Sequence, residues 1–72
     1  MPREVHAHIT GTVWKIEAAV GATVSEGDAI VILESMKMEM PVEAPVGGRV
    51  VAIKVTEGQA VQEGAVVALI EE

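Results

Sequence analysis

Apolar and polar residues alternate along most of the chain, in short runs bounded by glycine. Alternation with a period of two over four to eight residues is typical of half-buried β-strands. The pattern predicts longer strands at residues 5–9, 12–17, 29–33, 38–44, 49–55 and 66–70. It also predicts very short strands around Val24 and Val61, with glycine-containing turns between the strands. The chain is therefore expected to be all-β.

The second half of the chain repeats the first. Residues 48–71 align with residues 11–34 without a gap, at an offset of 37 positions. Two copies are too few for a solenoid or a propeller, so we expect them to face each other. The predicted fold is one domain over residues 1–72, an all-β flattened barrel or sandwich of two antiparallel sheets with two-fold pseudosymmetry. The glycines match as a set, which indicates special backbone positions: Gly11 with Gly48, Gly21 with Gly58, and Gly27 with Gly64.

Composition supports strands and limits the possible functions. The chain has 13 Val, 6 Ile and 4 Thr but only 2 Leu, and β-branched side chains suit a pleated sheet. It has no cysteine, and Trp14 is its only aromatic residue. The net charge of −6 argues against nucleic acid, which requires a basic surface. No apolar run reaches about 20 residues and no signal peptide is visible, so we expect no membrane span and a cytoplasmic protein.

One heptapeptide departs from these rules. Residues 34–40 read ESMKMEM and place three of the four methionines around Lys37. The segment joins the two copies, so we expect a hairpin turn at Met36-Lys37 with the lysine at the tip. Hairpin turns favour Asn, Asp or Gly because the central residues need positive φ, and Met-Lys provides none of these. A local rule broken in an otherwise consistent sequence indicates function.

Strand alternation assigns the neighbouring side chains to faces. Glu39 and Glu43 are expected on one face of the strand that leaves the turn, and Pro41 and Pro45 suggest an edge strand, since proline donates no ladder hydrogen bond. Extended through the turn, the same alternation places Met36, Met38 and Met40 on one face with Glu34. Met40 is the methionine expected to enter the core.

The stretch LESMKMEMPVEAPVGGRV resembles the biotin-attachment segment of biotinyl domains, which belong to the biotin/lipoyl attachment family. Met-Lys-Met is that family's signature for a biotin acceptor, so the resemblance implies that Lys37 carries biotin. It also implies that Met36 and Met38 are recognised by the ligase, and it matches Gly48 to the glycine that opens the strand after the hairpin. The chain is most similar to short, single-domain biotin carboxyl carrier proteins.

The resemblance implies a carrier without an active site of its own. Biotin protein ligase would attach biotin to Lys37 through an acyl adenylate. The modified lysine would then act as a swinging arm that takes carboxylate from a biotin carboxylase to a carboxyltransferase, in an acyl-CoA carboxylase. Tethering keeps the cofactor at a high effective concentration near both sites. Glu34 and Glu39 are candidate partner contacts, and we expect the free domain to be monomeric.

Other interpretations remain open. Lipoyl domains share the fold but usually read Asp-Lys-Ala, so a lipoyl or dual carrier is one alternative, and an unmodified interaction module is another. Ser35 departs from the family, since many biotinyl domains have Ala there. A stand-alone enzyme is disfavoured because the sequence shows no nucleophile–base pair and no phosphate-binding glycine loop. His6 and His8 lack clustered ligands, so no metal site is expected.

Overall fold

The computed structural model describes residues 2–72, and this part of the chain forms eight β-strands without a helix. The strands are β1 (Arg3–His6), β2 (Gly11–Ile16), β3 (Thr23–Val24), β4 (Ala29–Ser35), β5 (Met38–Glu43), β6 (Gly48–Ile53), β7 (Ala60–Val61) and β8 (Val66–Glu71). All eight predicted strands are confirmed. β1 differs most from its predicted range of 5–9, because the chain bends at residues 8–10. No helix in residues 2–72 has the length and hydropathy needed to span a membrane.

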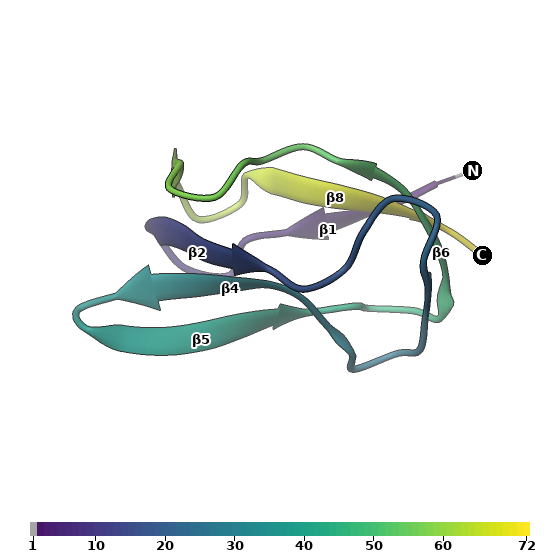
Figure 1. Ribbon diagram of the computed structural model, residues 1–72, viewed down its shortest axis with the longest axis horizontal. Helices are drawn as coiled ribbons and strands as arrows, with labels where there is room; N and C mark the ends of the chain where they lie inside the picture. Colours follow the sequence, from purple (N-terminus) through teal and green to yellow (C-terminus); the bar gives the residue numbers. More distant parts are fainter. Residues whose placement is uncertain (1) are drawn as a thin grey trace.

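The strands form two four-stranded antiparallel sheets (Figure 1). One sheet has the order β1-β8-β6-β3 and the other has the order β5-β4-β2-β7. The predicted fold of two antiparallel sheets is confirmed, and of the two forms expected the chain adopts the sandwich, with the barrel not closed. A closed barrel needs a continuous ladder, and here the edge strands of one sheet do not pair with those of the other.

The two copies form equivalent structures. Replacing each strand by its counterpart in the other copy converts one sheet order into the other. The register repeats as well, since Thr12 lies opposite Glu34 in one sheet and Arg49 lies opposite Glu71 in the other. Even the β-bulges correspond, one between Val13 and Lys15 and one at the equivalent place in β6. Because the two copies share one backbone structure, side chains at equivalent positions of the two sheets can be compared directly.

The core lies between the sheets and consists of Val, Ala, Ile and a single Leu. Its largest fully buried side chains include Ile30, Leu33 and Ile70, and each such burial contributes about 1.5–3 kcal/mol. Within residues 2–72 no polar or charged residue is buried. Met40 was expected in the core but is only half-buried, and the buried residue of that strand is Val42.

Glycine occupies the positions where other residues would be strained. The four turn glycines have φ between 89° and 94°, a region that side chains with a Cβ rarely adopt: Gly21, Gly27, Gly58 and Gly64. Gly48 is needed for a different reason, because a Cβ there would overlap the backbone carbonyl of Glu71. The prediction that the repeated glycines mark special backbone geometry is confirmed.

Candidate functional site

The strands β4 and β5 are joined by a turn of two residues, Met36 and Lys37. Ser35 pairs with Met38 across the base of the turn. Met36 has φ of 53° and Lys37 has φ of 65°, and these are the only positive φ angles of non-glycine residues in the described chain. Positive φ at both central residues defines a type I′ hairpin turn. The predicted two-residue turn is confirmed, and it contains no Asn, Asp or Gly, the residue types that such a turn favours.

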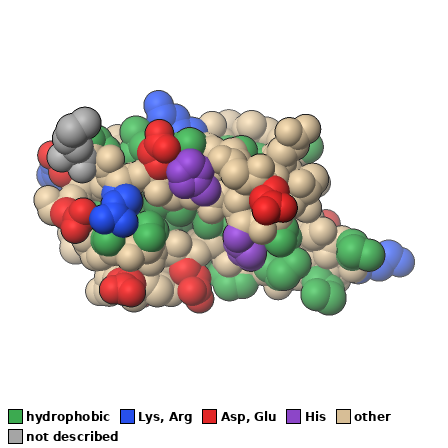
Figure 2. All heavy atoms as spheres, turned by 180° about the vertical axis from the view of Figure 1, so that it is seen from behind, with side chains coloured by type: hydrophobic (Ala, Val, Ile, Leu, Met, Phe, Trp, Pro, Cys, Tyr) green, Lys and Arg blue, Asp and Glu red, His purple; other side chains and the backbone are tan. Residues whose placement is uncertain are grey.

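The turn stands at one end of the molecule. The fold measures 33 Å along its longest axis and 17 Å across, and the β4–β5 turn and the two chain ends lie at opposite ends of the long axis (Figure 1). Met36 is 92% exposed, and Lys37 is exposed as well. Seen from behind, a basic side chain forms the far projecting end, with hydrophobic side chains beside it (Figure 2). The lysine amine is therefore presented to solvent at the tip.

The base of the hairpin is positioned by Gly11 on β2. A Cβ at Gly11 would lie 2.7 Å from the carbonyl oxygen of Glu34 and 3.4 Å from the Cβ of Ser35. Glycine at this position lets β2 approach the end of β4, which fixes the direction in which the hairpin leaves the sheet. The sequence identified Gly11 as a repeated glycine but did not reveal this contact. Its counterpart Gly48 makes the equivalent close approach in the other sheet.

The side chains beside the turn lie on two faces, and not as the sequence predicted. Glu34 pairs directly with Glu39, so these two exposed carboxylates share the outer face of the sheet. Met38, which is 58% exposed, and Met40 lie on the opposite face. The prediction that the methionines share a face with Glu34 is wrong, because paired residues across a two-residue turn are an odd number of positions apart.

The strand β5, which leaves the turn, has the position and the exposed face that the sequence predicted. Pro41 lies in β5, which is an edge strand of its sheet, as predicted. An edge strand tolerates proline because one side of its backbone has no ladder partner. Glu39 and Glu43 are both exposed on this strand, in agreement with the face predicted for them.

The reactive group at the tip of the hairpin is the primary amine of Lys37. Residues 2–72 contain no pocket, and they bring together no group of three or more His, Cys, Asp or Glu side chains that could hold a metal ion. Lys37 is exposed at the tip of the hairpin, and its primary amine can serve as an attachment point once it is deprotonated. An exposed primary amine at the end of a protruding hairpin suits a group attached through an amide bond.

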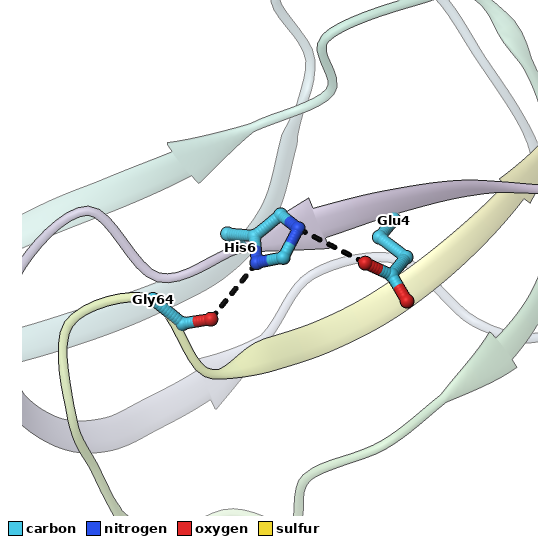
Figure 3. A network of polar contacts seen from close by, with 3 residues as sticks. All are labelled: Glu4, His6 and Gly64. Atoms are coloured by element: carbon cyan, nitrogen blue, oxygen red, sulfur yellow. Dashed lines mark hydrogen bonds and ion pairs between the residues drawn. The ribbon is translucent and has the colours of Figure 1, made fainter.

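The two histidines lie on β1 and in the bend after it, and do not belong to the β4–β5 turn. The Nδ1 atom of His6 is 2.8 Å from the carbonyl oxygen of Gly64, and its Nε2 atom is 3.2 Å from the carboxylate of Glu4 (Figure 3). The contact with Gly64 joins β1 to the turn before β8, and the contact with Glu4 lies within β1. His8 is exposed in the bend that follows β1.

The family model described as "Biotin-requiring enzyme" matches residues 1–70. This chain belongs to the biotin/lipoyl attachment family. As a biotin/lipoyl domain it is 40% identical over 70 residues to the "Biotinylated protein TB7.3 homolog" of Mycobacterium leprae, an alignment that covers 97% of this chain and 99% of the relative. It is 47% identical over 58 residues to the biotin carboxyl carrier protein of Streptococcus mutans, covering 81% of this chain and 45% of that protein.

Solved structures place the biotin/lipoyl domain within much larger carboxylases. The urea carboxylase of Kluyveromyces lactis matches with a TM-score of 0.94 and 39% identity over 99% of this chain, which is 6% of that chain. A single-chain, multi-domain long-chain acyl-CoA carboxylase matches with a TM-score of 0.87 and 33% identity, also over 99% of this chain and over 7% of its own. The fold and family predicted from the sequence are confirmed, and covalently attached biotin is the cofactor that the family implies.

Proposed function

We propose that Lys37 carries biotin in an amide bond, and that this chain is the biotin carrier of an acyl-CoA carboxylase. The observation behind the assignment is the strained turn that presents a lysine at the tip of the molecule. Two non-glycine residues hold positive φ there, in a chain that elsewhere gives such positions to glycine. Selection for the Met36-Lys37 side chains explains why a turn sequence that costs stability is kept.

The chain itself contributes position and a nucleophile. A biotin protein ligase supplies the acyl adenylate and the basic, desolvated site that a lysine amine requires. The Nζ atom of Lys37 then forms a bond to the acyl carbon, the bond from that carbon to the phosphate oxygen breaks, AMP leaves, and the amine loses a proton. Met36 and Met38 offer flexible apolar side chains that the ligase can close over. Bound biotin supplies a ring nitrogen that can hold a carboxylate.

The partners are proposed from the chemistry and from the relatives. The chain is 45% identical over 67 residues to part of a biotin-dependent acyl-coenzyme A carboxylase alpha3 subunit of Mycobacterium leprae, of which it spans 11%. It is also 40% identical over 63 residues to pyruvate carboxylase of Bacillus subtilis, of which it spans 6%. A biotin carboxylase and a carboxyltransferase are therefore the enzymes that Lys37 would visit, and a flexible tether raises the effective concentration at both.

A second candidate is lipoate attachment. The chain is 40% identical over 60 residues to a "Biotin/lipoyl attachment protein" of Bacillus subtilis, covering 82% of it. A two-residue turn with an exposed lysine suits either acid, since both are joined through the same amide. The residues that flank Lys37 decide between them, and Met-Lys-Met favours biotin.

Intact mass spectrometry tests the proposal. The chain is co-expressed with a biotin protein ligase in one sample and with a lipoate ligase in another, and Lys37→Arg is the control because it keeps the charge but removes the primary amine. A single biotinyl increment that is absent from the variant supports attachment at Lys37. A lipoyl increment as well would establish a dual carrier, and no increment in either sample would leave an unmodified interaction module.

A further inference from the structure

The three methionines of the attachment hairpin differ in how far solvent reaches them. Met36, at the first position of the turn, is 92% exposed and is the most exposed large hydrophobic side chain in residues 2–72. Met38 is 58% exposed. Met40 is half-buried and lies opposite Leu33, whose side chain is fully buried. Hydrophobic side chains are visible beside the basic end of the molecule (Figure 2).

Exposure makes two of these methionines the sulfur atoms most open to an oxidant. The chain has no cysteine, so methionine is the only residue type through which it offers sulfur to a peroxide. The peroxide must reach the sulfur atom to react with it. The order of oxidation expected from the exposed fractions is therefore Met36, then Met38, then Met40.

The oxidant we consider is hydrogen peroxide, and the product is methionine sulfoxide. A lone pair of the sulfur attacks one peroxide oxygen, an S–O bond forms and the O–O bond breaks. The departing hydroxide takes the proton from the new S–OH group and leaves as water, so that the sulfur has lost two electrons and the peroxide has gained them. Methionine sulfoxide reductases reverse the step with a dithiol, which becomes a disulfide while the oxygen leaves as water.

Oxidation would change the surface directly beside the acceptor amine. A ligase that reaches the Nζ atom of Lys37 has to enclose a two-residue turn, and Met36 and Met38 are the neighbours of that lysine in the chain. A sulfoxide makes each of them polar, and covering a polar group that lacks a hydrogen-bond partner lowers affinity by roughly tenfold. The amine itself is unchanged. Because both side chains are exposed and not part of the core, the fold does not depend on them.

We propose that Met36 and Met38 form a reversible oxidation site that controls biotin attachment. The ligase accepts the chain when both side chains are thioethers and rejects it when both are sulfoxides. The proposal rests on the proposed attachment of biotin to Lys37. It places the control on the unmodified chain, because attachment is the step that acts on the free amine.

The test begins with the unmodified full chain and hydrogen peroxide. After unfolding, trypsin cleaves behind Lys37 and so separates Met36 from Met38 and Met40, which fragment spectra then distinguish. Sulfoxide should form first at Met36 and last at Met40. Far-UV circular dichroism of the oxidised chain should match that of the untreated chain.

The oxidised chain is then offered to a biotin protein ligase with biotin and ATP, and intact mass counts the biotinyl increments. The KM of the ligase for the chain should rise roughly tenfold or more, with little change in kcat. Treatment with the two epimer-specific methionine sulfoxide reductases and a dithiol should restore the original KM, because these enzymes act on sulfoxides and on no other oxidation product of the chain.

Three variants locate the effect. Met40→Leu removes the half-buried thioether and should lose as much on oxidation as the parent. In the double variant Met36→Leu, Met38→Leu, peroxide should change the KM by less than about twofold relative to the untreated sample of the same variant. Met38→Gln carries a polar side chain that peroxide leaves unchanged, and it should raise the KM without any oxidant.

The opposing outcomes are distinct. An unchanged KM after full conversion of Met36 and Met38 to sulfoxide would overturn the proposal, as would a loss that the reductases do not reverse. An equal loss in the double leucine variant, or an oxidised chain that has unfolded, would place the effect elsewhere in the chain and overturn it too. An untreated parent chain that gains no biotin would instead remove the proposed function, and intact mass shows this before any peroxide is added.

Discussion

Replacing Met36 and Lys37 by residues that favour positive φ should raise the unfolding free energy, and it removes the lysine proposed to carry biotin. We consider the double variant Met36→Asn, Lys37→Gly, which installs the Asn-Gly pair that type I′ turns favour. The native residues hold φ of 53° and 65°. Left-handed backbone costs roughly 1–2 kcal/mol for a residue with an ordinary side chain, and much less for Asn or Gly.

The expected gain follows from these two residues. The full strain of both is an upper bound of about 2–4 kcal/mol, and the glycine loses about 0.5–1 kcal/mol through its greater freedom in the unfolded chain. The unfolding free energy should therefore rise by about 1–2 kcal/mol, against a total of roughly 4–11 kcal/mol for a domain of this size. For a domain of 60–100 residues this corresponds to roughly 5–15 °C in Tm.

Urea unfolding followed by far-UV circular dichroism measures the change, with an unchanged m-value as evidence that the unfolded state is the same. Glu26→Asn is the matched control, because it creates an Asn-Gly pair with Gly27 at a turn whose first residue has no positive φ. That control should stay within about 0.5 kcal/mol of the parent. If the double variant were no more stable than the parent, the native turn would not be strained, and its explanation by function would fail.

Two further substitutions test the close backbone approach at Gly48 and the charge repulsion at Glu39. Gly48→Ala should lower the unfolding free energy by about 2 kcal/mol or more, because its Cβ would overlap a backbone carbonyl, while Gly47→Ala has no neighbour closer than 3.5 Å and should be close to neutral. Chemical denaturation of both variants checks this, and equal effects would contradict it. Glu39→Gln should raise the unfolding free energy by about 0.2–1 kcal/mol at low salt by relieving the facing carboxylates, and the gain should shrink at 1 M salt. Glu43→Gln, opposite Ala29, should show no such salt dependence, and a gain that persists in salt would exclude charge repulsion as the cause.

Local signals in the sequence were sufficient for the strands and the turn. Period-two alternation and the repeated glycines are properties of neighbouring residues, and they located all eight strands. Relations between strands were harder to predict, since pairing depends on register. The two-residue turn sets Glu34 opposite Glu39, whereas alternation carried through the turn assigned Met38 to the face of Glu34. The choice between a flattened barrel and a sandwich stayed open for the same reason, because pairing between edge strands depends on both strands and cannot be read from the sequence of either one.

The internal duplication helps to separate the needs of the fold from those of function. Both copies build the same strands with the same registers and bulges, so requirements of the backbone act equally on each. A residue type that both copies share, such as the glycine at positions 11 and 48, is explained by geometry. A difference between equivalent positions needs another cause, and three such differences lie in the sheet that carries the hairpin: Thr12 where the other copy has Arg49, Trp14 where it has Val51, and Pro41 where it has Glu4. Because they occur in the copy that ends in Met36-Lys37 and the shared backbone does not require them, substitution at these positions tests whether recognition of that hairpin is the cause.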